Sequence, residues 1–190
     1  MKNFEMLTSP VEAFERVHEC YANKEECLFG GVSNVDFTTH GAIPGTSKRV
    51  ELKERNFLQC SYLGGTCIGY AGNVFICAVT KTRSNYIHKL CHIVKNFLDN
   101  RGIPAEVIGN DVIYYDESGA MRKIASGGNC CSVKYGMCCA AFQVSIHIDE
   151  DYVKNVCTKP VKKIPSSLDR FNITGEELFE YIKENLTKEV

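Results

Sequence analysis

The sequence lacks long hydrophobic runs, an excess of charge of either sign, internal repeats and low-complexity tracts. No apolar run reaches the roughly 18 residues that a membrane-spanning helix needs, and the N-terminus has no apolar core of a signal peptide. The formal net charge is -1, from 22 basic and 23 acidic residues, so the chain carries no electrostatic footprint for nucleic acid. We therefore expect a cytoplasmic protein with neither a membrane nor a nucleic-acid partner.

The sequence contains 11 cysteines and no secretory signal, and the spacing of the cysteines is not that of metal ligands. An odd number without such a signal argues for free thiols in a reducing compartment. Cys77 and Cys91 occupy apolar positions of a strand pattern and a helix pattern, where we expect them in the core. The pairs Cys130-Cys131 and Cys138-Cys139 are adjacent strand residues, which point to opposite faces, unlike a Cys-x-x-Cys knuckle. No metal site is predicted from the cysteines.

The 190 residues suffice for one well-buried domain, which we expect to span residues 1–190. Capping boxes at Ser9 and Thr174 predict helices to about Asn23 and Leu186, and a third apolar helical pattern ends at Gly102. Strand patterns between these helices, with hairpin turns at 116–119 and around Gly136, predict an α+β fold. We expect a mainly antiparallel β-sheet with about three helices packed on it.

Two histidines, His88 and His92, are one helical turn apart in the predicted third helix, as metal ligands can be. No carboxylate or third ligand accompanies them, which favours a packing role over a metal site.

The stretch from Met121 to Leu168 carries the residues best suited to chemistry. Lys123 lies in a glycine-rich turn and Cys157 in a polar loop. A thiol is a nucleophile as the thiolate, and a nearby ammonium lowers its pKa, so a Lys/Cys pair brought together by the fold would be an acyl-transfer centre. Taken singly, Lys123 also reads as a solvated lysine and Cys157 as an ordinary loop thiol.

A second candidate is the glycine-rich segment 63–73, which follows a predicted strand. Glycines at this density let the backbone approach a ligand or adopt positive φ. Composition alone leaves a binding loop and a β-turn equally open.

The order of elements and five short motifs resemble the biotin/lipoate protein ligase superfamily, which includes the lipoate-protein ligases and the lipoyl(octanoyl) transferases. The matching segments cover roughly residues 25 to 186. They are the glycine-rich loop from Leu63 to Asn73, Gly109-Asn110-Asp111-Val112, Arg122-Lys123-Ile124-Ala125-Ser126, Asn155-Val156-Cys157-Thr158, and Ile164-Pro165-Ser166-Ser167-Leu168.

This resemblance implies an acyltransferase that moves an octanoyl or lipoyl group from a carrier thioester to a lysine of a lipoyl carrier domain. Cys157 would be the nucleophile and Lys123 would hold the thiolate and the oxyanion. An acyl carrier protein or a lipoyl carrier domain would be the partner, with lipoate or octanoate as the transferred group and no tightly bound cofactor. The implied substrate-binding residues are Gly64, Gly65, Thr66, Gly72, Asn73, Asn110, Asp111, Ser126 and Gly127.

The sequence departs from the family pattern at several positions. Gln59 and Cys60 stand where the ligases have arginines, Gly69 stands where the family has a histidine, and a later family histidine is replaced near Cys138. We also expect no counterpart of the small C-terminal domain found in many lipoate ligases, which favours the transferase branch. Three alternatives stay open: an ATP-dependent lipoate or biotin ligase that uses Lys123, a non-catalytic member that binds an acyl chain or a carrier domain, and a thiol-rich metal or redox protein.

Overall fold

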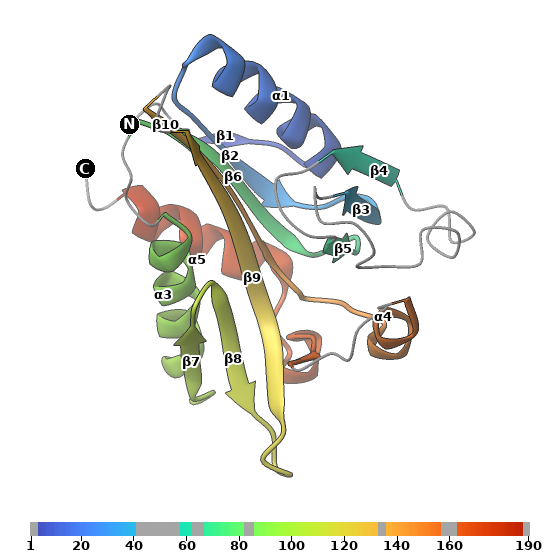
Figure 1. The fold of residues 1–190 in the computed structure, drawn as a ribbon. Coiled ribbons are helices and arrows are strands. Elements are labelled where there is room, and N and C mark those ends of the chain that lie inside the picture. The colour runs from blue at the N-terminus through green and yellow to red at the C-terminus, as the bar shows by residue number, and fades with distance from the viewer. Residues whose placement is uncertain are drawn as a thin grey trace.

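The structure, a computed structural model, describes residues 4–40, 58–61, 67–81, 86–132, 136–156 and 163–187. Two β-sheets lie at its centre (Figure 1). The larger contains, in spatial order, β1 (Glu5–Met6), β2 (Cys27–Val32), β6 (Val74–Thr80), β10 (Met137–Val144), β9 (Met121–Ser132), β8 (Asp111–Tyr115) and β7 (Ala105–Ile108), with β11 (Ile164–Pro165) paired to β9. The smaller contains β4 (Leu58–Ser61), β3 (Phe37–His40) and β5 (Cys67–Gly69).

Most neighbouring strands run antiparallel, as the sequence predicted. The exceptions among the described strands are the pairs β1–β2, β11–β9 and β3–β4, which are parallel. The described helices are α1 (Pro10–Asn23), α3 (Tyr86–Asp99), α4 (Glu150–Val156), α5 (Gly175–Thr187) and the short 3-10 helix η1 (Asp169–Phe171). The predicted α+β class is confirmed.

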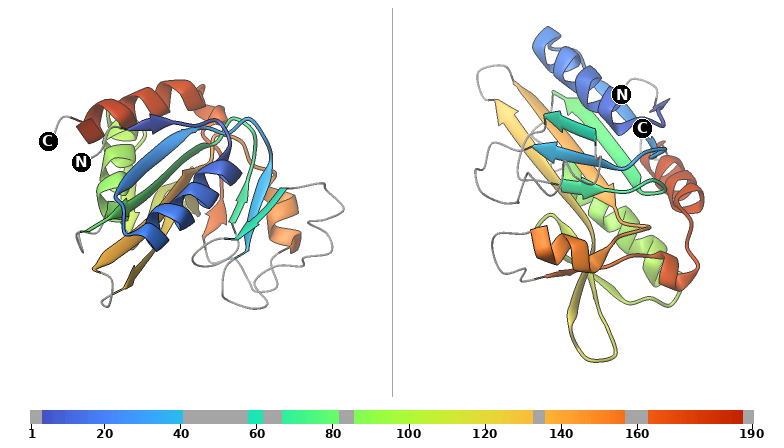
Figure 2. Two further views of the ribbon diagram at one scale, coloured as in Figure 1. Left: turned by 90° about the horizontal axis from the view of Figure 1, so that it is seen from above. Right: turned by 90° about the vertical axis from the view of Figure 1, so that its right-hand side faces the viewer.

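Helices cover both faces of the larger sheet (Figure 2). Helices α3 and α5 share one apolar core with the sheet, and α1 packs in a second core on the opposite face. Strand β6 has an almost entirely apolar sequence because all seven of its residues are buried. Its alternate residues Val74 and Ile76 enter the first core, whereas Phe75 and Cys77 enter the second.

The helix-start signals are confirmed where the structure describes them. The Ser9 hydroxyl accepts a hydrogen bond from the Glu12 amide at 3.2 Å, and the Thr174 hydroxyl accepts one from the Glu177 amide at 3.3 Å. After α3 the chain turns at Gly102, whose φ is +72°. None of the described helices is long and apolar enough to cross a membrane.

The prediction for the cysteines can be compared with the structure where their side chains are described. Cys20, Cys27, Cys77, Cys91 and Cys139 form no disulfide, and all of them except Cys20 are buried. Cys138 is disulfide-bonded, so the expectation of free thiols is wrong at this position. Burial raises the pKa of the Cys91 thiol to about 12, so this cysteine is a packing residue rather than a nucleophile.

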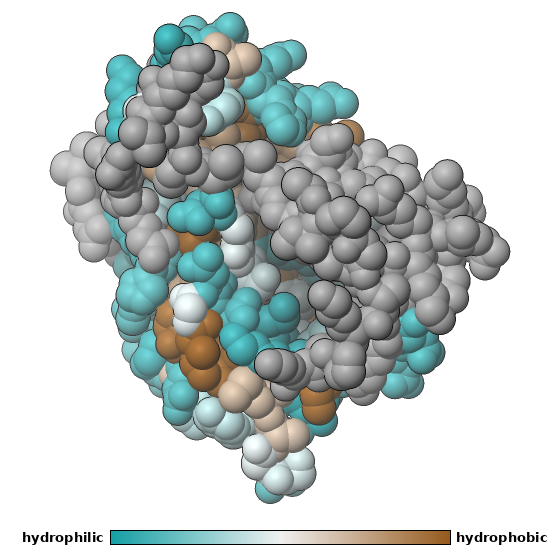
Figure 3. All heavy atoms as spheres, in the orientation of Figure 1, coloured by the Kyte–Doolittle hydropathy of each residue, from teal (hydrophilic) through white to brown (hydrophobic). Residues whose placement is uncertain are grey.

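The β7–β8 hairpin carries apolar side chains on the surface. Ile108 is 37% exposed and Tyr115 is 47% exposed. Figure 3 shows hydrophobic colour gathering over these two strands, next to hydrophilic residues. This hairpin also forms one wall of a pocket described below.

Close packing of α3 against β9 depends on Gly127. A Cβ atom at this position would lie 2.7 Å from Ile87 Cδ1 and 2.9 Å from the Ala141 carbonyl oxygen. We expect Gly127→Ala to lower the free energy of unfolding by about 1–3 kcal/mol, because an added methyl in a packed core forces its neighbours to move. Urea unfolding of the two proteins measures the difference.

The Ile87→Val background gives the control for this prediction. Valine removes the Cδ1 atom that the new methyl would meet first, so Gly127→Ala should cost less stability in that background. Ile87 Cγ2 and the Ala141 carbonyl oxygen remain close in either background. A Gly127→Ala variant as stable as the wild type would contradict the packing explanation.

Candidate active site

An irregularity in β9 decides which face of the sheet its side chains reach. Val112 pairs with Ala125 and Ile113 pairs with Lys123, so Ile124 is an extra residue that β8 does not match. Such a bulge re-aims the side chains that follow it. As a result Lys123 and Ser126 share one face, because their partners Ile113 and Asp111 are two residues apart on β8.

That face of the larger sheet is directed toward the smaller sheet. Asp111, Ser126 and Gln143 lie in register on three neighbouring strands, β8, β9 and β10. The Gln143 side-chain amide donates a hydrogen bond at 3.2 Å to the carbonyl oxygen of Ile68 in β5. Polar side chains therefore line the larger sheet where the smaller sheet approaches it.

Next to Gln143 on the same face, the residues are apolar and buried. Phe75, the next residue in register after Gln143, is 1% exposed, and Ala141 is 7% exposed. Helix α4 contributes Tyr152, which packs with Ile68 and Tyr70 of the β5 region. The polar row thus borders apolar residues that pack in the core under α1 and beside α4.

Lys123 is held in β9 through its backbone, and no described residue pairs with its ammonium group. Its carbonyl oxygen accepts a hydrogen bond from the Ser166 amide at 2.9 Å, and its neighbour in β11 is Pro165. Within the described part of the chain, its ammonium forms neither a hydrogen bond nor an ion pair. The Asp111 carboxylate, on the same face, is instead ion-paired with Lys163.

The other predicted binding residues divide into two groups. The Asn110 carbonyl oxygen accepts a hydrogen bond from the Gly127 amide at 3.0 Å, so these two residues join β8 to β9. A side chain at position 127 would collide with Ile87 of α3, so close packing explains the glycine there. Gly64, Gly65, Thr66 and Cys157 lie outside the described residues.

Gly72 and Asn73 shape the turn between β5 and β6. Gly72 has a φ of +87°, and a Cβ atom there would lie 2.8 Å from the His147 ring. Asn73 is 1% exposed, and its side-chain oxygen accepts hydrogen bonds from the amides of Ile146 at 2.9 Å and His147 at 2.8 Å. These contacts fix the chain after β10, and they give both residues a structural role.

The His147 ring is oriented by an acidic residue. Its Nδ1 lies 3.0 Å from Asp169 Oδ2, and the Ser167 hydroxyl donates to Asp169 Oδ1 at 2.7 Å. Burial raises the pKa of the Asp169 carboxyl, but the hydrogen bonds from Ser167 and His147 outweigh it, so the pKa is lowered overall. This arrangement was not predicted, because 22 residues separate the two partners.

Sequence reasoning also missed an ionic cluster around Arg122. Its guanidinium donates to Asp116 at 2.6 Å and to Glu150 at 3.1 Å. Hydrogen bonds from Ser118 and then from Arg122 hold the pKa of the Asp116 carboxyl well below its usual range. The cluster ties the β8–β9 turn to the first residue of α4. An Asp-x-Ser turn signal marked Asp116, but nothing local marked Glu150 as its neighbour.

Metal-binding residues do not gather in the described segments. No group of three or more His, Cys, Asp or Glu side chains suited to a metal ion is formed there. The rings of His88 and His92 pack edge to face, with centroids 4.4 Å apart.

Comparison with known proteins gives matches in structure only. No family model matches the sequence, and no curated protein matches it. Among solved structures, lipoate-protein ligase A bound with ATP has a TM-score of 0.73 at 12% identity, over 98% of this chain and 84% of the other. LipL1 of P. falciparum in complex with lipoate has a TM-score of 0.71 at 17% identity, over 97% of this chain and 60% of the other.

A third structure comprises a bipartite lipoate protein ligase from Thermoplasma acidophilum and its E2 lipoyl domain. It has a TM-score of 0.74 at 13% identity, over 98% of this chain and 82% of the other. Identities of 12–17% establish the fold and leave the activity open. The chain has the fold seen in these lipoate-protein ligase structures, which is the fold that the motif resemblance implied.

Proposed function

We propose that this protein transfers an octanoyl or lipoyl group to the ε-amine of a lysine on a lipoyl carrier domain, with Lys123 holding the acyl carbonyl. The observation that carries the proposal is Lys123 itself. Its ammonium has no partner among the described residues, and Lys123 shares a face with Ser126 beside the buried apolar residues of the α1 core. Structures of the same fold contain lipoate in one case and an E2 lipoyl domain in another.

The chemistry proceeds in two displacements. The Cys157 thiolate attacks the thioester of the donor, a new C–S bond forms, and the donor thiolate leaves and takes up a proton. The amine of the acceptor lysine then attacks the enzyme thioester, forms the amide and releases the Cys157 thiol. In both steps a negative charge develops on the carbonyl oxygen, where the Lys123 ammonium stabilises it.

The remaining predicted residues serve binding in this proposal. Backbone amides of Gly64, Gly65 and Thr66 would orient the acyl group. Ser126, in register with Gln143, would contact its polar end. Burying the chain against apolar walls contributes about 0.8 kcal/mol per methylene, which favours a medium-length chain over acetate.

Intact-protein mass spectrometry tests this function. We expect wild-type protein incubated with octanoyl carrier protein to gain one octanoyl group that hydroxylamine removes, because a thioester is labile to this reagent. Cys157→Ala should gain none, since it lacks the nucleophile. Cys20→Ala is the matched control, because Cys20 is a free thiol that is partly exposed on α1.

An adduct that persists in Cys157→Ala would contradict the thioester scheme. Loss of the adduct in Cys20→Ala, with Cys157 intact, would move the reaction to the other thiol.

A second candidate is an ATP-dependent lipoate ligase. The observation in its favour is the similarity to lipoate-protein ligase A bound with ATP. In this reaction Lys123 would hold an acyl-adenylate and Cys157 would play no part. Modification of a lipoyl domain that requires ATP and free lipoate, and that survives Cys157→Ala, would establish this reaction. Binding of a carrier domain without turnover under either condition would instead point to a non-catalytic member of the fold.

A further inference from the structure

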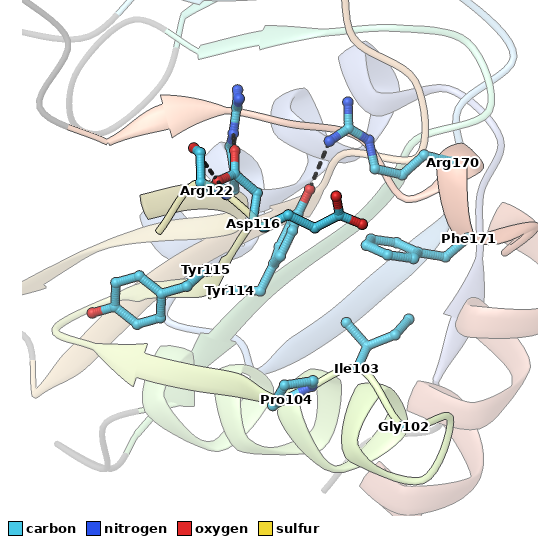
Figure 4. A pocket seen from close by; sticks show the side chains of 11 residues that line it. Gly102, Ile103, Pro104, Tyr114, Tyr115, Asp116, Arg122, Arg170 and Phe171 are labelled. Carbon is cyan, nitrogen blue, oxygen red and sulfur yellow. Dashed lines mark hydrogen bonds and ion pairs between the residues drawn. The ribbon is translucent and has the colours of Figure 1, made fainter. Parts of the chain in front are cut away.

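A pocket of about 610 Å³ opens on the side of β9 opposite Lys123. Tyr114 pairs with Arg122 across β8 and β9, whereas the next residues, Ile113 and Lys123, pair on the other face. The pocket therefore lies on the α3 side of the sheet, separate from the proposed acyl site. Figure 4 shows it between the connection after α3, the end of β8 and η1.

One end of the pocket is apolar and aromatic. Ile103 and Pro104 form its lower part in Figure 4, and Phe171 closes one side. The Phe171 and Tyr114 rings pack edge to face, with centroids 5.3 Å apart and an interplanar angle of 78°. Rings held in this way offer a flat ligand both edge and face contacts.

The other end carries Arg170, the more exposed of the two guanidinium groups in this cluster. Its Nη1 donates to the Tyr114 hydroxyl at 2.9 Å, and its Nη2 lies 3.6 Å from a Glu150 oxygen. Its side chain is 43% exposed. Arg122, by contrast, makes two shorter contacts with carboxylates and is 20% exposed. Arg170 thus retains N–H donors that can reach a ligand in the pocket.

Two acidic groups around the pocket, Asp116 and Glu150, already have basic or hydrogen-bonding partners. Asp116 already accepts from the Ser118 amide, the Ser118 hydroxyl, the Ala120 amide and Arg122, at 2.6–3.0 Å. Glu150 is shared by two guanidinium groups. Glu117 also lines the pocket and is exposed, as Arg170 is. Arg170 is therefore the lining group left for an anionic ligand, and Glu117 is the one left for a cationic ligand.

We propose that this pocket is a binding site for a compact aromatic carboxylate. The carboxylate accepts hydrogen bonds from the Arg170 guanidinium, whose planar fork matches its two oxygens. The ring lies on Ile103, Pro104 and Phe171. The site does not depend on the proposed acyl transfer, since Lys123 and Cys157 take no part in it.

Calorimetric titration with benzoate, and with benzylamine as its charge-reversed counterpart, tests the proposal. Benzoate should bind the full chain measurably, and benzylamine should bind at least about fivefold more weakly. Arg170→Gln should weaken benzoate binding about tenfold, the size expected when a charged hydrogen-bond partner is lost. Glu117→Gln should leave benzoate binding unchanged or tighten it, because a nearby negative charge is removed.

Further measurements separate a binding role from a folding role. Arg170 contacts Tyr114, so Arg170→Gln can lower stability; Phe171→Leu keeps the apolar bulk and should still weaken benzoate binding about threefold by removing a ring contact. Benzoate should also shift the NMR signals of Tyr114 and Tyr115 in wild-type protein. The proposal is overturned if benzylamine binds more tightly, if neither compound binds at 10 mM (roughly the weakest affinity worth fitting), or if folded Arg170→Gln binds benzoate as wild type does.

Discussion

Lys123→Met is expected to lower the rate of acyl transfer at least about a hundredfold while the protein stays folded. Removing one preformed donor to a developing oxyanion typically costs a factor of about 100 to 1,000 in the rate. Methionine keeps the apolar length of the lysine stem and removes only the charge. Stability should change little, because the ammonium forms no hydrogen bond or ion pair with the described residues and the strand is held through the Lys123 backbone.

The rate is measured as modification of a lipoyl domain over time, under saturating donor. Lys183→Met is the matched control: this lysine pairs with Glu180 on the exposed side of α5 and should leave the rate unchanged. Because the proposed contact strengthens in the transition state, the loss should appear in kcat more than in KM.

Two results would separate the possible roles of Lys123. A large rise in KM with an unchanged kcat would make this residue a binding group for the ground state. A rate within threefold of wild type would contradict its proposed role, whichever donor is used.

The fold was predictable where the sequence signal is local or periodic. Ser9 and Thr174 marked helix starts, because a capping hydroxyl and its partner amide are only three residues apart. The apolar run from Val74 to Val79 predicted a buried strand, and β6 has all seven of its residues buried. Its place between β2 and β10 was beyond prediction, since strand order depends on contacts between distant segments.

The candidate site was predictable in its residue types and less so in its arrangement. The lysine motif drew attention to Lys123 and Ser126, but strict alternation would place them on opposite faces. The extra residue Ile124 brings them to the same face, and no local pattern announces that bulge. Lys163, which pairs with Asp111, was likewise invisible because 52 residues separate the two.

The pocket behind β9 escaped sequence reasoning for a related reason. Its lining residues come from three separate segments, represented by Ile103, Arg122 and Arg170. Each has an ordinary local explanation as a loop, strand or helix residue. Only the sheet register and η1 bring them around one space, so the site exists in the fold rather than in any motif.

The second large effect is expected at Asn73. Asn73→Ala should lower the free energy of unfolding by about 2–4 kcal/mol, because the backbone amides of Ile146 and His147 lose their shared acceptor. The residue is 1% exposed, so water cannot replace the lost oxygen without a local opening. Urea unfolding measures the change, and a fall in the midpoint at constant slope would locate the effect in the native state.

Asn73→Asp tests the same contact with the acceptor kept. Its carboxylate oxygen can still receive both amides, so this variant should lose less stability than Asn73→Ala despite burying a charge. The octanoyl adduct formed per folded molecule, measured well below the unfolding temperature, distinguishes structure from binding. If Asn73 serves the fold, adduct yield stays at the wild-type level in both variants. Wild-type stability with lost adduct formation would instead make Asn73 a substrate-binding residue, as the motif resemblance implies.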